Sequence, residues 1–492
     1  MGITNGFDIK NQRNLTMLVD FYELTMANGY LSKNAHDTIA YFDMFFRRVP
    51  DNGGYCIMAG VEQLIEYLKG LKFTEDDITY LRSKNLFSED FLTYLKNFKF
   101  TCDVWAIPEG TPVFPSEPLI TVRGPIMQAQ FVETMILLTI NHQTLIATKA
   151  ARICEAANGR PVMEFGSRRA QGYDGALYGA RAAIIGGCSS TACTMADELF
   201  NVPVTGTMAH SWVQLFDTEY DSFKAWAETY PDNTVLLVDT YNVLKSGVPN
   251  AIKVFDEVLK PLGKRPKGIR IDSGDIAYLS KEVRKMLDEA GYEDVKITIS
   301  NSLDEFIIKA VLDNGAQIDS FGVGERLITA KSEPVFGGVY KLVAIEKDNT
   351  IIPKIKISEN VEKITNPGFK SLYRIYDKRS KKAIADLISL HDDKFDENRS
   401  LELFHPNYTW KKKKINNYII KNLMVQIFKS GNCIYNSPSV MDIKEYSFSE
   451  RANLWDEIKR LQNPHQYYVD LSKNLWNLKE SLLHEYSSIY EE

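Results

Sequence analysis

Residues 268–275, Gly-Ile-Arg-Ile-Asp-Ser-Gly-Asp, decide how the middle of this chain folds. A short β-branched run stops at Asp272, and a few turn-forming residues later apolar residues recur with helical spacing. Arg270 and Asp272 therefore sit where a buried strand meets a helix N-terminus. Because that end carries free N–H groups and a partial positive charge, it favours anions. A cation and a carboxylate at such a place suit a phosphorylated sugar and its metal ion.

This stretch is one of several strand–helix units between residues 146 and 335. Candidate strands end near Phe165, Cys188, Gly206, Asp239, Asp272, Asn301 and Gly322, with helical patterns between most of them. Because parallel strands need a crossover connection, the alternation predicts a parallel sheet with helices outside. We expect an α/β fold, an irregular parallel (β/α) barrel of about seven strands. An open doubly wound sheet is the alternative, although no Gly-x-Gly-x-x-Gly motif opens the first unit.

The sequence outside this region has a different texture. Residues 1–145 mix helices and strands, and the prolines and glycines of 104–125 indicate turns in an antiparallel sheet. Residues 336–380 return to strand patterns, which we expect to pair with the N-terminal strands in one α+β domain. Residues 381–492 are more charged, and we expect a helix-rich C-terminal region there. Within it, Lys411–Lys414 is interpreted as a solvated loop in preference to a phosphate site.

Composition narrows the class of protein. The 492 residues are 44% hydrophobic and 25% charged, as in an ordinary globular protein. A formal net charge of −6 argues against a nucleic-acid partner, and the apolar runs are too short to span a membrane. The six cysteines are scattered without a Cys-x-x-Cys pair, and no secretory signal is visible. We therefore expect a cytoplasmic protein with reduced thiols.

The candidate strands share polar chemistry at their carboxyl ends. In parallel α/β folds these ends line the ligand site, so the sequence predicts one site built from all of them. The ends read Glu164–Arg169, Gly206–His210, Val238–Asn242, Arg270–Asp272, Ser300–Ser302 and Gly322–Arg326.

Three basic side chains at these ends are candidates for the site. Arg168 and Arg169 follow a glycine, and arginine presents a rigid fork to carboxylate or phosphate. A surface salt bridge is the structural alternative for either residue. His210 ends a Gly-Thr-Met-Ala-His turn, where imidazole can act as a base or a nucleophile. A lone histidine is more often structural, but its place among the other strand ends favours a functional role.

Two carboxylates end neighbouring candidate strands. Asp239 and Asp272 supply the hard oxygen ligands that Mg²⁺ takes together with water and substrate phosphates. Helix N-capping is the structural alternative for each of them.

Two glycine pairs lie after the last candidate strands. Gly322 with Gly324, and Gly337 with Gly338, allow the backbone to approach a phosphate closely. Glycine pairs are common in turns, but barrel phosphate sites often lie at this point in the chain.

Together these stretches resemble the nicotinate phosphoribosyltransferase family. The matching segments follow the family's order and are Asp20–Met26, Phe165–Gly172, Gly206–Ser211, Val238–Asn242, Arg270–Asp275, Ser320–Gly324 and Phe336–Gly338. The resemblance implies that nicotinate and phosphoribosyl pyrophosphate give nicotinate mononucleotide and pyrophosphate. This is the first step of NAD salvage from nicotinate, with ATP hydrolysis driving the equilibrium. It also implies Mg²⁺ and a homodimer whose subunits share active sites.

The resemblance assigns roles to individual residues. His210 would be phosphorylated by ATP, and Arg270 and Asp272 would hold the phosphoribosyl group and its Mg²⁺, with Asp239 nearby. Phe165 and Tyr22 would sandwich the pyridine ring, with Tyr22 coming from the partner subunit. Arg168 would lie beside that ring. The 5′-phosphate would be surrounded by Gly322, Gly324, Gly337 and Gly338. Arg47 and Arg48 are compatible with either a pyrophosphate contact or a surface role.

Three other functions are compatible with parts of the sequence. A nicotinamide phosphoribosyltransferase is the runner-up, but the Ser-Arg-Arg-Ala-Gln-Gly run after Phe165 favours nicotinate. An aldolase-type barrel acting on a phosphosugar would need a lysine or a base at a strand end, which is not convincingly placed. A non-catalytic binding protein on this scaffold would have lost the strand-end residues.

Overall fold

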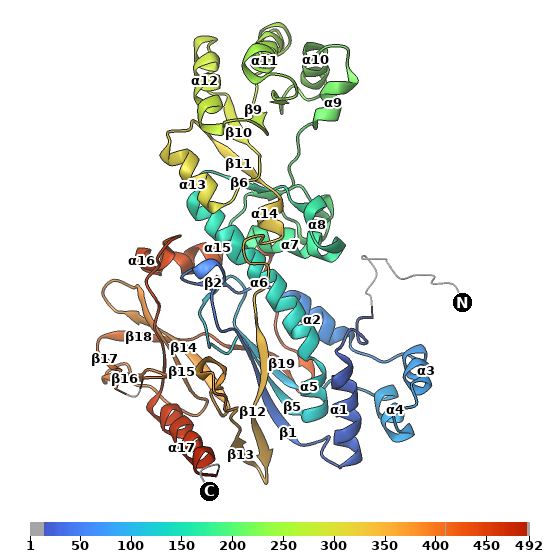
Figure 1. The fold of residues 1–492 in the computed structure, drawn as a ribbon, viewed down its shortest axis with the longest axis vertical. Coiled ribbons are helices and arrows are strands. Elements are labelled where there is room, and N and C mark those ends of the chain that lie inside the picture. Colours follow the sequence, from blue (N-terminus) through green and yellow to red (C-terminus); the bar gives the residue numbers. More distant parts are fainter. Residues whose placement is uncertain (1–13, 409, 490–492) are drawn as a thin grey trace. The chain divides into compact units, whose positions relative to one another are not determined.

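The computed structural model describes residues 14–408 and 410–489 (Figure 1). The chain forms two compact units. Unit 1 comprises Met1–Thr144, Val335–Pro438 and Tyr446–Glu492, and unit 2 comprises Leu145–Pro334 and Ser439–Glu445. The division after Thr144 falls inside helix α6 (Glu133–Ala156) and the division after Glu445 inside helix α15 (Val440–Ala452), so each of these helices contributes residues to both units.

Unit 2 is built on a six-stranded sheet in which every pair of neighbours is parallel. The sheet order is β7 (Ser190–Thr191), β6 (Val162–Glu164), β11 (Ser320–Val323), β10 (Lys296–Ile299), β9 (Gly268–Ile271) and β8 (Val235–Leu237). Val204 adds an isolated parallel bridge to Thr191 beside this sheet. The isoleucines of β9 and β10 are fully buried, because helices cover the sheet.

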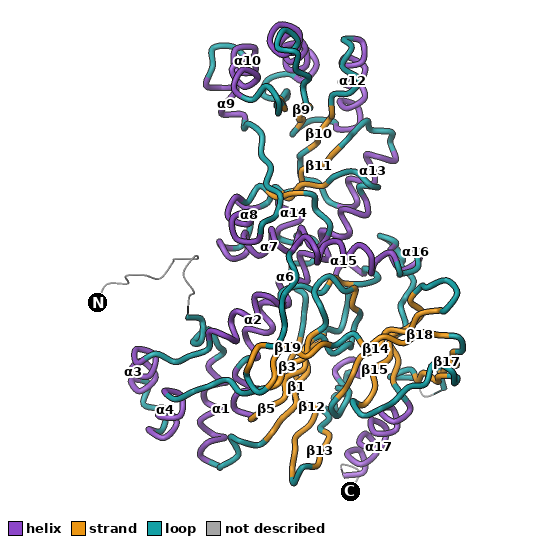
Figure 2. The backbone as a smooth tube through the Cα atoms, turned by 180° about the vertical axis from the view of Figure 1, so that it is seen from behind, coloured by secondary structure: helices purple, strands orange, loops and turns teal. Residues whose placement is uncertain are grey.

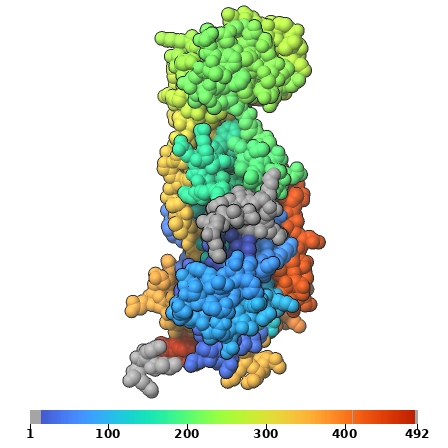
Figure 3. All heavy atoms as spheres, turned by 90° about the vertical axis from the view of Figure 1, so that its right-hand side faces the viewer, coloured from blue at the N-terminus to red at the C-terminus, as the bar shows by residue number. Residues whose placement is uncertain are grey.

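Helices of unit 2 follow the carboxyl ends of the strands β6, β7, β9, β10 and β11. Asp275 caps α12 by accepting a hydrogen bond from the Tyr278 N–H, and Asp304 caps α13 in the same way. Figure 3 shows the heavy atoms of α10 and α11, in green, as one continuous surface. The helices are α7 (Gly172–Gly186), α8 (Thr194–Phe200), α9 (His210–Leu215), α10 (Glu219–Thr229), α11 (Val248–Val254), α12 (Ile276–Glu289), α13 (Glu305–Asp313) and α14 (Glu325–Ile328).

Unit 1 contains a seven-stranded sheet in which the pairs are antiparallel (Figure 2). Its centre joins distant segments, since β1 pairs with β12 on one side and with β5 on the other. The order is β13 (Thr350–Pro353), β12 (Val339–Lys347), β1 (Ile39–Phe45), β5 (Ile120–Pro125), β3 (Asp103–Ala106), β19 (Val425–Lys429) and β20 (Asn432–Cys433).

A second sheet in unit 1 is formed by residues after 369. Its order is β17 (Lys412–Ile415), β16 (Leu401–Phe404), β21 (Val469–Leu471), β15 (Ala383–Leu390), β14 (Lys370–Asp377) and β18 (Tyr418–Asn422). The region after residue 381, expected to be helix-rich, contains the helices α15, α16 (Asp456–Lys459) and α17 (Lys473–Ile489) and also the strands β15 to β21, which were not expected. Among these strands β15 is eight residues long and largely apolar, whereas Lys412–Ile415 is a strand that overlaps the lysine run that was expected to be a solvated loop.

Helices and a short strand pair complete unit 1. The pair consists of β2 (Cys56–Ile57) and β4 (Pro112–Val113). The helices of this unit that lie outside α6 and α15 are α1 (Phe21–Ser32), α2 (Val61–Gly70), α3 (Glu75–Ser83), α4 (Glu89–Lys96), α5 (Ile126–Phe131), α16 (Asp456–Lys459) and α17 (Lys473–Ile489).

The mixed α/β class and the parallel sheet expected from the sequence are confirmed. Closure of the parallel sheet into a barrel stays a prediction. Across the described residues, no helix combines the length and the apolar character needed to cross a bilayer.

Candidate functional site

Arg270 lies on β9, and its guanidinium is held by side chains from neighbouring connections. Its Nε donates to Ser300 Oγ at 2.6 Å, and its Nη1 donates to Thr207 Oγ1 at 3.1 Å. Its Nη2 lies 3.5 Å from Asp272 Oδ2. Because several partners fix the planar fork, the arginine is positioned before any ligand arrives. Its side chain remains 16% exposed, so it can still meet an anion.

Asp272 connects Arg270 to the histidine predicted from the sequence. Its Oδ1 accepts from Ser300 Oγ at 2.8 Å, and its Oδ2 lies 3.8 Å from His210 Nε2. The other ring nitrogen, His210 Nδ1, is 3.1 Å from Thr240 Oγ1. The contact to Thr240 fixes the ring orientation and leaves Nε2 facing the carboxylate.

Asp239 lies just after β8, and its two carboxylate oxygens have different surroundings. Its Oδ2 accepts from the Asp272 N–H at 3.0 Å and from Ser273 Oγ at 2.6 Å. Its Oδ1 is buried and has no hydrogen-bond partner among the described residues. A buried carboxylate oxygen without a donor is suited to a cation, so Asp239 and Asp272 fit a Mg²⁺ site. Within residues 14–408 and 410–489, no group of three or more His, Cys, Asp and Glu side chains could hold a metal, so water and substrate would complete the ligand set.

Phe165 forms an aromatic wall beside this cluster. Arg270 Cζ lies 5.6 Å from the centroid of its ring, within the range of a cation–π contact. A Cβ added to Gly322 would lie 2.5 Å from the ring atom Phe165 Cδ2. A Cβ on Gly324 would lie 3.0 Å from the Phe165 carbonyl oxygen. Close packing against Phe165 therefore explains why glycine is needed at both positions. The role of these glycines in binding phosphate stays a prediction.

The turn after Phe165 is held by the buried Glu164. Glu164 accepts from the Gly166 N–H and, at 2.6 Å, from Thr191 Oγ1. Burial raises the pKa of the Glu164 carboxyl above its usual range, although both hydrogen bonds act in the opposite direction. The 3-10 turn Ser167–Arg169 follows, and both of its arginines, Arg168 and Arg169, are exposed.

Tyr22, Gly337 and Gly338 belong to unit 1. Tyr22 lies on α1 with 44% of its surface exposed. Burial of its hydroxyl, followed by the charges of Glu133 and Glu23, raises its pKa above the usual range. Gly337 has φ +70°, which favours glycine, and a Cβ on Gly338 would lie 2.2 Å from Asn141 Oδ1. The structure thus gives each glycine a backbone or packing reason of its own.

The structure adds residues that sequence reasoning did not assign to the site. Ser300 bridges Arg270 and Asp272, Thr207 holds the guanidinium, and Thr240 holds His210. All three lie inside or directly beside the strand ends that the sequence singled out. Their position was a signal, but hydroxyls are common in turns and only the contacts distinguish them.

These contacts define the strand-end cluster, which consists of Thr207, His210, Asp239, Thr240, Arg270, Asp272 and Ser300. The cluster offers a fixed cation for an anion, two carboxylates for a metal ion and an imidazole nitrogen facing the same space. Such a set can stabilise charge separation in a sugar phosphate and accept a phosphoryl group.

Comparison with known proteins identifies the family to which the chain is similar. The chain matches the nicotinate phosphoribosyltransferase N-terminal domain over residues 17–141 and the C-terminal domain of the same enzyme over 369–479. It is 45% identical over 480 residues to nicotinate phosphoribosyltransferase of Bacillus subtilis, covering 97% of both chains. The Caenorhabditis elegans enzyme of that name is 34% identical over 543 aligned positions, covering 97% of this chain and 95% of its own.

A solved structure agrees with these sequence matches. The crystal structure of human nicotinic acid phosphoribosyltransferase superposes with a TM-score of 0.84 at 28% identity, covering 94% of this chain and 99% of the human chain. The full-length identity to the bacterial enzyme and this shared fold lead to one conclusion: the chain belongs to the nicotinate phosphoribosyltransferase family.

Proposed function

We propose that this protein transfers the phosphoribosyl group of phosphoribosyl pyrophosphate to nicotinate, giving nicotinate mononucleotide and pyrophosphate, in NAD salvage. The observation that carries the proposal is the strand-end cluster, in which Arg270, Asp272 and His210 face one space. This cluster lies in a chain 45% identical along its length to the Bacillus subtilis enzyme of that name.

The chemistry follows from the charges that develop during transfer. The bond between the ribose C1 and the pyrophosphate oxygen breaks, which leaves positive charge on the ribose and negative charge on the leaving group. The Arg270 guanidinium is already fixed by Ser300 and Thr207, so it stabilises anionic phosphate without reorganising. The pyridine nitrogen then forms the new bond to C1 with its own electron pair and needs no general base.

Asp239 and Asp272 are the residues that would hold Mg²⁺. Their support is the unpartnered Oδ1 of Asp239 and the position of both residues at neighbouring strand ends. When bound, the ion neutralises charge on the phosphates. An Asp272→Asn variant should weaken binding of phosphoribosyl pyrophosphate far more than binding of nicotinate, measured by calorimetry in the presence of Mg²⁺. Equal weakening of both ligands would contradict this assignment.

ATP enters the proposal as a co-substrate through His210. With Nδ1 held by Thr240, the Nε2 lone pair can attack the γ-phosphorus, forming an N–P bond as ADP leaves. Hydrolysis of that bond releases phosphate and couples ATP to transfer. Incubation with ATP should add the mass of one phosphoryl group to the His210 peptide. His210→Ala should keep slow, uncoupled transfer, and undiminished ATP stimulation in that variant would disprove the role.

The pyridine subsite is proposed from aromatic and basic side chains. Phe165 and, from the partner subunit of a homodimer, the equivalent of Tyr22 would enclose the ring. Arg168 would lie near the nicotinate carboxylate, and the four glycines 322, 324, 337 and 338 near the 5′-phosphate. The exposure of Arg168 and of the Tyr22 ring supports these contacts. Sedimentation of the intact protein as a monomer under assay conditions would contradict the shared site.

The runner-up substrate is nicotinamide, which lacks the carboxylate. Nicotinate and nicotinamide should be mixed at equal concentration with phosphoribosyl pyrophosphate, Mg²⁺ and ATP, and the two mononucleotides separated. Predominant formation of nicotinate mononucleotide is expected. Predominant formation of the amide product would overturn the substrate assignment. We also infer a cytoplasmic location, which the scattered cysteines without a Cys-x-x-Cys pair support.

A further inference from the structure

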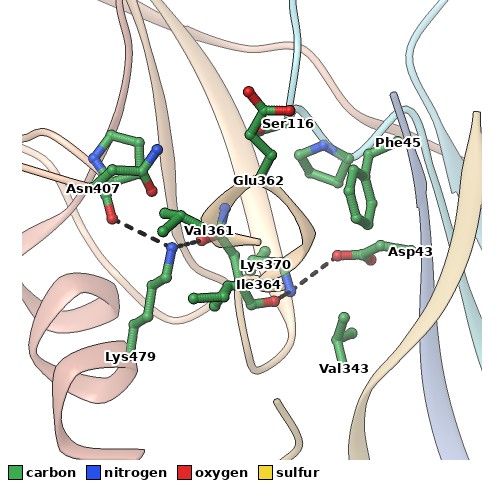
Figure 4. Close-up of a pocket in the computed structure, with 13 residues that line it drawn as sticks. Asp43, Phe45, Ser116, Val343, Val361, Glu362, Ile364, Lys370, Asn407 and Lys479 are labelled. Carbon is green, nitrogen blue, oxygen red and sulfur yellow. Dashed lines mark hydrogen bonds and ion pairs between the residues drawn. The ribbon is translucent and has the colours of Figure 1, made fainter. Parts of the chain in front are cut away.

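A small cavity in unit 1 is lined by two buried lysines. Its lining residues are different from those of the strand-end cluster. It has a volume of about 50 Å³ and is bounded by β1, the segment between residues 361 and 370, and α17 (Figure 4). We call it the lysine cavity. Its lining residues are Asp43, Phe45, Ser116, Pro118, Val343, Val361, Glu362, Ile364, Asn366, Lys370, Pro406, Asn407 and Lys479.

Lys370 is fully satisfied by the protein. Its side chain is 3% exposed, and its Nζ donates to Asp43 Oδ2 at 2.9 Å. The same nitrogen donates to the carbonyl oxygens of Asn366 at 2.8 Å and Gly368 at 2.6 Å. An ammonium group has three donors, so Lys370 has a counter-charge and no spare hydrogen bond.

Lys479 is equally buried but lacks a counter-charge. It is 4% exposed, and its Nζ donates to Asn366 Oδ1 at 3.1 Å and to the Pro406 carbonyl oxygen at 3.3 Å. Both acceptors are neutral, and among residues 14–408 and 410–489 no carboxylate is paired with this nitrogen. Burial lowers the pKa of Lys479 to about 8, against the charge of Glu480. A buried cation without a partner is costly, so an anion beside it would stabilise the fold.

The surrounding groups favour an oxygen-rich anion. Asn366, whose Oδ1 accepts from Lys479, and Asn407 both line the cavity, and each side-chain amide carries N–H donors. In Figure 4 the Glu362 side chain extends away from Lys479, and the Asp43 carboxylate is engaged by Lys370. A volume of about 50 Å³ exceeds the roughly 10–15 Å³ that one water needs, so a small polyatomic group fits.

We propose that the lysine cavity binds a small oxyanion, either free phosphate or a small carboxylate, against Lys479 Nζ. The anion supplies the missing counter-charge and links α17 to the segment around Asn366. That segment also contacts the residues that follow β1, where Arg47 Nε donates to the Glu362 carbonyl oxygen at 3.1 Å. Occupancy of the cavity therefore stabilises the junction between these three segments of unit 1.

Binding of radiolabelled inorganic phosphate to the intact protein by equilibrium dialysis tests the proposal. Lys479→Met should bind one phosphate fewer per chain than the wild type. Lys473→Met removes an exposed lysine of the same helix and should bind as many as the wild type. Equal stoichiometry in all three proteins would overturn the site. Any phosphate held by the strand-end cluster is common to all three, so failure here is distinct from failure of the proposed transfer activity.

Two further measurements keep the test independent of the variant's folding. Wild-type crystals soaked in selenate should show an anomalous peak within hydrogen-bond distance of Lys479 Nζ, and a cavity containing water only would overturn the proposal. Acetate added to the dialysis distinguishes the two sources. Displacement of the Lys479-dependent phosphate identifies a site open to carboxylates, whereas retention identifies a site selective for phosphate.

Discussion

The strand-end cluster of unit 2 and the buried ion pairs of unit 1 use the same residue types in opposite ways. Arg270 and Asp272 lie 3.5 Å apart and retain 16% and 29% exposure. In unit 1, Arg374 and Asp386 are joined by two hydrogen bonds and are 1% and 0% exposed. The partly exposed pair can still bind a ligand, whereas the buried pair is bound by other groups of the protein.

The difference teaches that charge type alone does not identify a site. Arg374 also donates to the Pro112 carbonyl oxygen at 2.7 Å, and Tyr467 Oη donates to Asp386 Oδ1 at 2.9 Å. Burial, followed by the charge of Asp386, raises the pKa of the neighbouring Glu117 well above its usual range. An unpartnered atom alone does not separate the two regions, because Asp239 Oδ1 and the buried Arg374 Nη1 both lack a hydrogen-bond partner among the described residues. The strand-end cluster differs in that its charged side chains remain partly exposed and can meet a ligand.

The largest expected effect comes from breaking the buried pair. Arg374→Met leaves Asp386 buried without its cation and should lower the free energy of unfolding by about 3–5 kcal/mol. Urea denaturation followed by circular dichroism measures the loss. Arg399→Met, at an exposed pair with Asp396, should change it by less than about 0.5 kcal/mol. Similar losses in the two variants would remove the distinction between buried and exposed pairs.

A substitution in the strand-end cluster should lower the enzymatic activity and leave the free energy of unfolding nearly unchanged. Arg270→Lys keeps the charge but loses the planar fork that contacts Ser300 and Thr207. We expect kcat/KM for phosphoribosyl transfer to fall about 100-fold, or about 2.7 kcal/mol, with unfolding changed by less than about 1 kcal/mol. Arg265→Lys, at an exposed pair with Asp294, is the matched control and should retain full activity. Full activity in Arg270→Lys would show that charge alone suffices.

The smallest effect concerns Glu23, a buried carboxyl of unit 1 without a cation. Its Oε1 accepts from Thr134 Oγ1 at 2.8 Å, while Oε2 has no hydrogen-bond partner among the described residues. Burial raises the pKa of Glu23 to about 8, against about 4.5 in the unfolded chain. The folded state therefore holds a proton that the unfolded state has lost, and stability falls as pH rises between these values.

The corresponding measurement compares unfolding at pH 5 and pH 8. The wild type should lose about 2 kcal/mol over this interval through Glu23, and Glu23→Gln should lose correspondingly less. Glu289→Gln, at an exposed pair with Lys285, should follow the wild type. An identical pH dependence in Glu23→Gln and the wild type would rule out this carboxyl as the source.

Much of the parallel sheet could be predicted because its signals are local. The expected strand end at Asp272 agrees with β9, which ends at Ile271, and the helix that follows begins at Ile276. The strands after residue 381 were not expected, because a strand is stabilised by partners that are distant in the sequence, as β15 is by β21. The histidine, the aspartates and Arg270 were located by the same strand ends that the structure brings together.

The sequence by itself determined the parallel strand–helix region and the polar residues at its strand ends, because backbone periodicity is encoded by neighbouring residues. Only the tertiary structure decided which charged side chains are paired within the protein and which remain available to a ligand. Lys370 meets Asp43 across the chain, whereas Lys479, equally buried, meets only neutral oxygens. Such pairings depend on how distant segments pack, and no local pattern carries that information.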